Sequence, residues 1–407
     1  MERGYLVCFS LIFGRKNTML IFKILIDCSN MRSGGAIQNG LAFLSLLSKS
    51  QFNEWFVAIS PELNKEFPNE YKDLLPNLFI INGSNNIYGI LKVIRQMKNI
   101  EKIISPDIVF SLSGPPYWRA KGIHISGFAK PQYLYPAIEK LLNTKLNYHE
   151  MIKRKIKLIL QKKMFNKMDY LVGQTDIVKK RACKALDFPK IRFFIIHNSY
   201  SQLFKQSICD KKLNISINFK SNSTRVFIPS AYYLHKNLEI VPLIASYLKK
   251  INKEVCFVFT IEKRSSEWKN IKGLAKRLKV EEMLKTIGQV AHKNLSIEYI
   301  KSNIILLPTL LECSSAVCPE AMMVGRPIVT TDLDFSRSLC GESALYYNYD
   351  DPKSAAEHIS AIIDNVDLKS KLINAGKIQL KNCYPSPSQK FNNQLDLINT
   401  ISKMNKL

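Results

Sequence analysis

The sequence predicts an α/β protein made of two domains, each with a doubly wound, mostly parallel sheet covered by helices. The chain has 407 residues, which is longer than one hydrophobic core usually supports, so two cores are expected. Short apolar runs alternate with segments of helical periodicity, as in repeated β-α-β units. Residues 207–223 lose this periodicity and gain polar residues, which indicates a linker between the domains.

The other boundaries follow from the same patterns. Residues 1–18 are interpreted as a lead segment, either disordered or upstream of the true start, because a convincing first strand follows Met19. The early apolar run is short and no small-residue cleavage site follows it, so a secretory signal is not expected. The predicted segments are an N-terminal domain at 19–206, the linker at 207–223, a C-terminal domain at 224–384 and a last helical segment at 385–407.

The N-terminal domain opens with a buried strand at 22–27, a glycine pair and a helix at 36–47. Glycines let the backbone approach a ligand at a helix start, although Gly34 and Gly35 suit a tight turn equally well. Further strands are expected at 55–59, 78–81, 107–112, 123–128, 170–173 and 192–196, with helices at 87–104 and 176–186. Two loops rich in Gly, Pro and aromatic residues, 113–119 and 127–136, follow strands and suit either ligand binding or rigid packing.

The net charge is +26 at pH 7, and part of it gathers in one predicted helix at 151–167. Its apolar residues form one stripe, which we expect to be buried, and its lysines crowd the other faces. The stripe comprises Ile152, Ile156, Ile159, Leu160, Met164 and Phe165. The lysines could face an anionic membrane surface. Nucleic acid is not expected as a partner, because no nucleic-acid-binding module is recognisable.

Two further features of the sequence indicate where in the cell the protein is expected. No run of about 18 apolar residues occurs, so no membrane-spanning helix is expected. The nine cysteines are scattered and show no zinc-finger spacing. Reduced thiols in a cytoplasmic protein fit this pattern best.

The C-terminal domain opens with a strand at 224–229, and a helix is expected from His235 to about Lys249. Later strands are predicted at 255–261, 286–288 and 303–307, with helices at 267–278, 295–302, 352–363, 368–381 and 391–404.

The most informative stretch is NIILLPTLLECSSAVCPEAMMVGRPIVTTD at 303–332. It reads as a strand, a loop, a helix at about 315–324, a stop at Gly325 and a second strand. Two carboxylates, Glu312 and Glu320, lie in the loop and in the helix. The backbone N–H groups at the helix start could bind a diphosphate. They belong to Ser315, Ala316 and Val317.

The pattern Glu312-x7-Glu320, followed by Ala321-Met322 and Gly325-x-Pro327, resembles the signature of retaining, nucleotide-sugar-dependent glycosyltransferases of the GT-B fold, glycosyltransferase family 4. The resemblance implies two Rossmann-like domains that face each other across a cleft, with the last helix crossing back to the first domain. It assigns the acceptor to the N-terminal domain and the nucleotide sugar to the C-terminal domain. No cofactor and no metal are implied.

The resemblance also implies roles for individual residues. Glu312 would contact the transferred sugar as the catalytic carboxylate, and Glu320 would bind the ribose. Lys236 would neutralise the diphosphate, and the glycine pair would lie against the donor. His124 is a second catalytic candidate, because the family has a His in this region, although its place early in a strand favours a buried structural role.

The sequence departs from the family pattern in one place. The family has an Arg a few residues before the Lys, but Ala231-Tyr-Tyr-Leu234 stands here, so one phosphate-binding cation is missing and His235 is a candidate substitute. Asp332-Leu-Asp334 resembles a metal motif of the other glycosyltransferase fold. Two carboxylates alone do not complete a metal site, so we interpret them as a loop and helix cap.

The predicted function is transfer of a hexose to a lipid-linked or polysaccharide acceptor in bacterial surface-glycan assembly, such as O-antigen or capsule. We expect a cytoplasmic protein bound peripherally to the inner face of the cell membrane. The alternative is a non-catalytic nucleotide-sugar-binding or scaffold subunit of a glycan-assembly complex.

Overall fold

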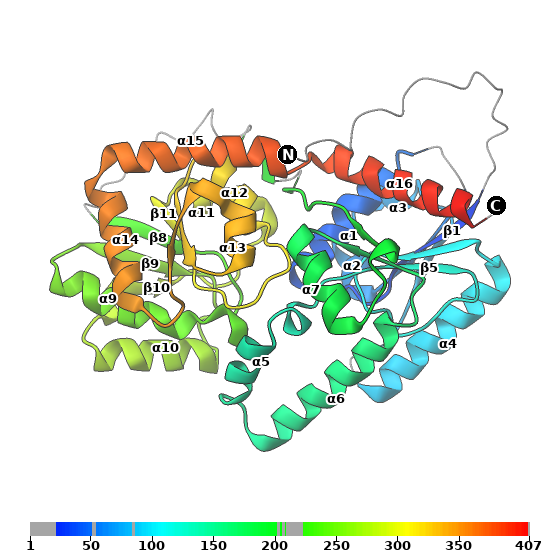
Figure 1. Cartoon of the computed structure of the whole chain (residues 1–407), viewed down its shortest axis with the longest axis horizontal. Helices are drawn as coiled ribbons and strands as arrows, with labels where there is room; N and C mark the ends of the chain where they lie inside the picture. Colours follow the sequence, from blue (N-terminus) through cyan, green and yellow to red (C-terminus); the bar gives the residue numbers. More distant parts are fainter. Residues whose placement is uncertain are drawn as a thin grey trace.

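The computed structural model describes residues 22–50, 54–83, 86–201, 204–205, 208 and 223–405. The predicted lead segment and nearly all of the predicted linker lie outside the described residues. Two parallel sheets form the protein, one of seven strands in the order β3-β2-β1-β4-β5-β6-β7 and one of six in the order β10-β9-β8-β11-β12-β13. This confirms the predicted α/β class with two doubly wound, Rossmann-like domains, which lie beside each other in Figure 1.

The seven-stranded sheet belongs to the N-terminal domain. Its central strands are largely buried, as in β1, where five of six residues are buried, because helices cover both faces of a parallel sheet. The strands are β1 Lys23–Cys28, β2 Glu54–Ile59, β3 Leu78–Ile80, β4 Ile108–Ser111, β5 Ile123–Gly127, β6 Tyr170–Gly173 and β7 Phe193–Ile195. The helices are α1 Gly34–Leu47, α2 Pro61–Glu66, α3 Asn69–Lys72, α4 Ile87–Ile104, α5 Pro136–Asn143, α6 Tyr148–Phe165 and α7 Asp176–Leu186.

The six-stranded sheet belongs to the C-terminal domain. The strands are β8 Thr224–Ile228, β9 Val255–Phe259, β10 Leu284–Thr286, β11 Ile304–Leu307, β12 Ile328–Thr331 and β13 Ala344–Tyr347. The helices are α9 Val241–Lys250, α10 Ser266–Arg277, α11 His292–Ile300, α12 Val317–Met323, α13 Asp334–Cys340, α14 Pro352–Asp364 and α15 Val366–Cys383. The helix expected from His235 is interrupted. Residues Leu234–Lys236 and Leu238–Ile240 form separate 3₁₀ turns around Asn237, whose φ is +51°, and α9 follows them.

The last helix, α16 at Pro387–Met404, leaves the C-terminal domain and returns to the N-terminal one (Figure 1). Phe391 packs edge-on against Phe43 of α1, with ring centroids 5.1 Å apart. The Lys390 ammonium donates to the side-chain oxygens of Asn39 and Asn198, at 2.7 and 2.8 Å. The predicted crossover of the C-terminal helix is therefore confirmed.

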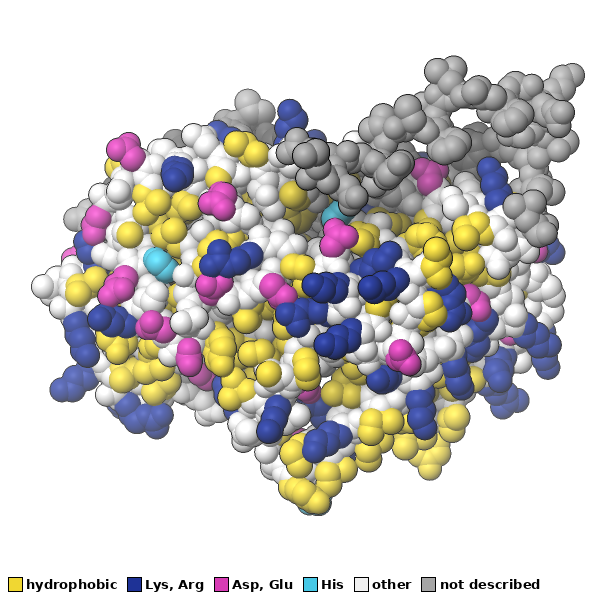
Figure 2. Space-filling view, viewed as in Figure 1, with side chains coloured by type: hydrophobic (Ala, Val, Ile, Leu, Met, Phe, Trp, Pro, Cys, Tyr) yellow, Lys and Arg dark blue, Asp and Glu magenta, His cyan; other side chains and the backbone are white. Residues whose placement is uncertain are grey.

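The prediction that the 151–167 helix buries its apolar stripe is wrong. In α6 only the last residue, Phe165, is buried, and it packs on Phe128 at 5.0 Å between ring centroids. Ile156, Ile159 and Leu160 are each more than half exposed. The reason is that α6 meets the core only at its C-terminal end and otherwise runs along the lower edge of the domain, where Figure 2 shows hydrophobic and basic side chains together.

No helix among the described residues combines the length and the apolar character that a membrane span requires. The described cysteines are all free, at positions 28, 183, 256, 313, 318, 340 and 383.

Candidate active site

The signature segment forms the predicted strand–helix–strand unit. Strand β11 pairs in parallel with β12, and α12 lies between them in sequence. The helix starts at Val317, two residues later than predicted, because Pro319 has no N–H and is tolerated only in the first turn of a helix. Ser315 and Ala316 therefore precede the helical residues. Gly325 follows the helix with a φ of +65°, a conformation that glycine adopts readily at a helix end.

Lys236 and Glu312 meet at the carboxyl ends of neighbouring strands. Lys236 follows β8, Glu312 follows β11, and the Lys236 ammonium donates to Glu312 Oε1. Both side chains are mostly buried. The two loops are also joined by their backbones, since Leu310 N–H donates to the His235 carbonyl at 2.7 Å. The structure thus brings together the residues that were predicted to bind phosphate and sugar.

Glu320 lies deeper in the C-terminal domain and is almost completely buried. Its Oε2 accepts a hydrogen bond of 2.8 Å from the Tyr299 hydroxyl on α11. Burial raises the pKa of Glu320 to about 7, and the Tyr299 hydrogen bond opposes this rise. Among the described residues the Tyr299 hydroxyl is the hydrogen-bond donor found for this carboxylate, and it bonds Oε2 rather than Oε1.

The glycine pair lies at the start of α1 and faces open space. Gly34 has a φ of +57°, and a Cβ added to either Gly34 or Gly35 would meet no atom within 4 Å. The preceding Ser33 makes no side-chain cap. The first N–H groups of a 14-residue helix are therefore open to a ligand.

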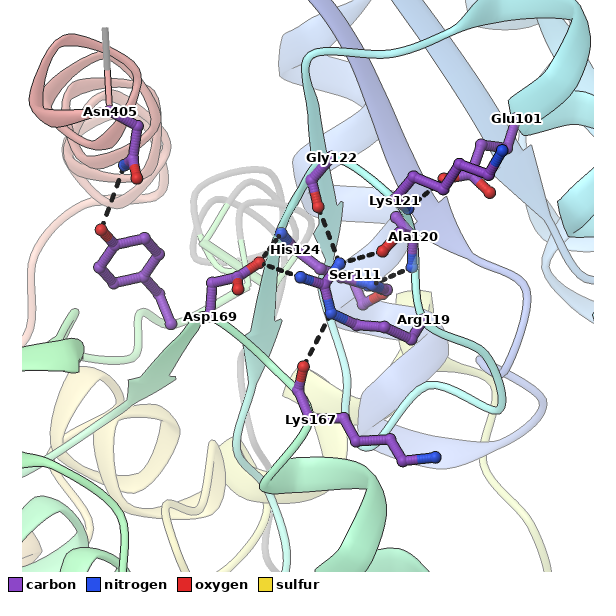
Figure 3. A network of polar contacts seen from close by, with 11 residues as sticks. Glu101, Ser111, Arg119, Ala120, Lys121, Gly122, His124, Lys167, Asp169 and Asn405 are labelled. Atoms are coloured by element: carbon purple, nitrogen blue, oxygen red, sulfur yellow. Dashed lines mark hydrogen bonds and ion pairs between the residues drawn. The ribbon is translucent and has the colours of Figure 1, made fainter. Parts of the chain in front are cut away.

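His124 is buried inside the N-terminal domain, within the network of Figure 3. Its Nδ1 accepts from the Ala120 N–H at 3.1 Å, so Nε2 carries the proton and donates to Ser111 Oγ at 2.9 Å. Ser111 in turn donates to Asp27. Burial, assisted by the nearby Arg119 charge, lowers the pKa of His124 to about 3. Because both ring nitrogens are bonded within the domain, the structure gives His124 a structural place and does not support it as a catalytic residue.

The interpretation of Asp332 and Asp334 as a loop and helix cap is right for the loop, which contains Asp332, but wrong for the cap. Asp332 is paired with Arg337, and the cap position of α13 is Leu333, which has no side-chain acceptor. Asp334 instead joins the two domains. Its Oδ2 accepts from both Nε and Nη2 of Arg181 on α7, at 2.9 and 2.6 Å, and its Oδ1 accepts from the Tyr135 hydroxyl at 2.8 Å.

This contact places the carboxyl ends of the two sheets opposite each other. Tyr135 follows β5, Asp334 follows β12, and one hydrophobic cluster contains residues of both domains, among them Phe128, Leu310 and Phe335. Sequence reasoning missed this contact as well as Tyr299, because no local pattern marks a residue whose partner lies far away in the chain.

Comparisons with known proteins agree with this fold. Residues 209–379 match the family of glycosyl transferases group 1. No curated protein matches the sequence. Among solved structures, the chain is similar to a glycosyltransferase from Rickettsia africae ESF-5, with a TM-score of 0.68 and 16% identity over 94% of this chain and 98% of that one.

Two other solved structures carry informative descriptions. WaaG, a glycosyltransferase involved in lipopolysaccharide biosynthesis, has a TM-score of 0.66 and 12% identity over 91% of this chain and 98% of that one. HepE from Anabaena, in complex with UDP-glucose, has a TM-score of 0.65 and 12% identity over 93% of this chain and 99% of that one. At such identities the likeness concerns the fold, which these proteins and this chain share.

Proposed function

We propose that this chain, a glycosyltransferase of the GT-B fold whose residues 209–379 match the glycosyl transferases group 1, transfers a hexose from a nucleoside diphosphate to a lipid-linked or polysaccharide acceptor with retention of configuration. The observation that carries the proposal is the Lys236–Glu312 pair at the carboxyl ends of β8 and β11. Open α/β sheets bind ligands at this edge.

Each end of the donor has a candidate partner. Lys236 binds the diphosphate, together with the backbone N–H groups of Ser315, Ala316 and Val317, and Glu320 Oε1 accepts a ribose hydroxyl. The start of α1 at Gly34 and Gly35 approaches the donor from the other domain. Without a donor, Lys236 and Glu312 neutralise each other. The diphosphate draws Lys236 away and frees the Glu312 carboxylate for the sugar.

The chemistry follows from these charges. The bond between the anomeric carbon and the phosphate oxygen breaks, and its electron pair stays on the diphosphate. Lys236 stabilises the developing negative charge, and Glu312 stabilises the positive charge on the sugar ring. The acceptor hydroxyl forms the new glycosidic bond, and its proton passes to the departing phosphate oxygen. Because Lys236 and the backbone N–H groups stabilise the phosphates, this proposal requires no metal.

A membrane surface is proposed as a further partner, through α6. The exposed Ile156, Ile159 and Leu160 can insert between lipid headgroups, and the surrounding lysines contribute about 1 kcal/mol each near an anionic surface. The protein would then work on the cytoplasmic face of the cell membrane, where lipid-linked acceptors of O-antigen or capsule assembly are found.

Vesicle sedimentation tests the membrane partner. Wild-type protein should sediment with vesicles that contain anionic lipid and be partly released by salt, and the double variant Ile156→Ser/Ile159→Ser should bind more weakly. Equal recovery from neutral and anionic vesicles would rule out the electrostatic part. Unchanged binding of the double variant would rule out insertion of α6.

Release of nucleoside diphosphate tests the catalytic proposal. Wild-type protein is incubated with UDP-, GDP- and dTDP-sugars, with and without a membrane extract as acceptor source, and Glu312→Gln serves as control. Release that depends on Glu312 is expected with one donor class. Binding of a donor without release would favour the alternative, a non-catalytic nucleotide-sugar-binding or scaffold subunit.

A further inference from the structure

The N-terminal domain has a second pocket at the amino ends of its strands, the edge of the sheet opposite the one that faces the C-terminal domain. Its volume is about 510 Å³, a size that suits a small-molecule ligand. Parallel pairing of β5, β6 and β7 brings the starts of these strands to one edge. Residues that line this amino-edge pocket include Arg119, Ile123, Asp169, Tyr170, Arg192 and Asn405.

Arg119 lines the pocket in a fixed orientation (Figure 3). Its Nε donates to the Lys167 carbonyl at 2.7 Å, and its Nη1 donates to the carbonyls of Gly122, at 2.7 Å, and Ala120. Its Nη2 donates to Asp169 Oδ2 at 2.6 Å. A guanidinium group has five N–H groups, so these four bonds leave one N–H of Nη2 without an acceptor among the described residues.

Positive charge exceeds negative charge around the pocket. Asp169 is the one carboxylate among the described lining residues, and its Oδ2 already accepts from Arg119 and from the His124 N–H, at 2.6 and 2.7 Å. Arg192 is exposed and forms no ion pair with a described carboxylate. Its guanidinium carbon lies 5.1 Å from the centre of the Phe188 ring. The second guanidinium group is therefore free to bind an anion.

The remaining polar lining adds a neutral donor. Asn405 Nδ2 donates to the Tyr170 hydroxyl oxygen at 3.1 Å and to the Ile401 carbonyl at 2.7 Å. The Tyr170 O–H itself has no acceptor among the described residues, so it can donate to a ligand. Lys121 also lines the pocket, but the Glu101 carboxylate accepts its backbone N–H at 2.5 Å and lies close to this exposed residue. We therefore assign Lys121 no part in binding.

A pocket with two guanidinium groups, a free hydroxyl donor and a carboxylate that is already bonded is suited to an oxyanion. Guanidinium groups match the geometry of phosphate oxygens and bind them with charge-assisted hydrogen bonds. We propose that the amino-edge pocket binds the phosphate group of a small ligand through Arg192, Tyr170 and the free N–H of Arg119. The site is separate from the candidate donor site and does not depend on the proposed function. The phosphate belongs to a free phosphorylated compound or to a lipid headgroup.

Calorimetric titration of inorganic phosphate and pyrophosphate tests the site. The background is Lys236→Met, so that the donor site lacks its cation. Adding Arg192→Met should weaken the remaining binding at least about tenfold, as expected for the loss of a charge-assisted hydrogen bond. Tyr170→Phe should weaken it less, because it removes a neutral donor. Lys190→Met is the matched control, since Lys190 is exposed in the same 3₁₀ turn as Arg192 and does not line the pocket, and it should leave binding unchanged.

Vesicle sedimentation distinguishes the two sources of the phosphate. The vesicles contain phosphatidylcholine alone or with phosphatidic acid, and Arg192→Met is compared with Lys190→Met in otherwise wild-type protein. A larger loss of binding to phosphatidic acid in Arg192→Met than in Lys190→Met would assign the site to a lipid headgroup. Equal vesicle binding of the two variants, together with weakened phosphate binding in Arg192→Met, would assign it to a free phosphorylated compound.

Two results would overturn the assignment. One is equal affinity for phosphate and pyrophosphate with and without Arg192→Met, or no binding of either ion to the Lys236→Met protein at millimolar concentration. The other is a fall in UDP affinity of Arg192→Met as large as the fall for pyrophosphate, because both ligands would then share one site. The separate location predicts that Arg192→Met binds UDP as the wild type does.

Discussion

Replacing Glu320 by Gln should stabilise the protein in a pH-dependent way. The carboxyl group is almost completely buried, and burial raises its pKa from the ordinary 4.5 to about 7 in the folded state. At a pH between these two pKa values, Glu320 is protonated in the folded protein and ionised in the unfolded chain. The free energy of unfolding therefore falls as the pH rises from 4.5 to about 7. Above the folded-state pKa, Glu320 lowers it no further. The difference between 4.5 and about 7 corresponds to about 3 kcal/mol.

Gln has nearly the same shape and does not titrate, so Glu320→Gln escapes this penalty. Its free energy of unfolding should rise relative to the wild type by about 3 kcal/mol between pH 4 and pH 8. Urea denaturation of both proteins across this range measures the difference. Other titrating groups are common to both proteins and cancel in the comparison.

Two outcomes would refute this reasoning. A difference that stays constant from pH 4 to pH 8 would mean that Glu320 has no raised pKa. A wild type that gains stability over the variant as the pH rises would mean that the charged carboxylate is favoured in the folded protein. Either result would mean that Glu320 is not buried against Tyr299 as described here.

Three other predictions follow from the same contacts. Tyr299→Phe removes the hydrogen bond that opposes the rise of the Glu320 pKa, so the stability loss should extend to higher pH in the same denaturation series; an unchanged profile would contradict this. Asp334→Ala removes the contact with Arg181 and Tyr135, in which the charged side chains of Asp334 and Arg181 are about 40% exposed. It should cost at most about 1 kcal/mol of stability but increase the radius of gyration in solution scattering, and an unchanged radius would show that other contacts hold the domains. Sugar transfer should persist in excess EDTA, because Lys236 and backbone N–H groups stabilise the diphosphate. A complete loss of transfer that a divalent cation reverses would reject that role.

The fold and part of the site could be predicted because their signals are local. Apolar runs, helical periodicity and glycine stops define β11, α12 and β12 within 28 residues, from Ile304 to Thr331. Parallel strands then bring the residues after their carboxyl ends to one edge, which is why Lys236 and Glu312 meet although they are 76 positions apart.

Other features depend on how distant elements pack, and no local pattern reports them. The apolar stripe of α6 follows the rule for a buried helix, but the helix reaches the core only at Phe165. Asp334 contacts Arg181, 153 positions away, in a different domain. Glu320 is chemically suited to ribose, yet its burial and its bond to Tyr299 could be found only in the folded structure.

The central claim is that the Lys236–Glu312 pair marks the site of a nucleotide sugar. Calorimetric titration of UDP-, GDP- and dTDP-sugars into the wild type and into Lys236→Met tests it most directly. The account predicts that the wild type binds one donor class and that the variant binds it at least about tenfold more weakly. Equal affinity of both proteins, or no binding of any nucleotide sugar by the wild type, would contradict it.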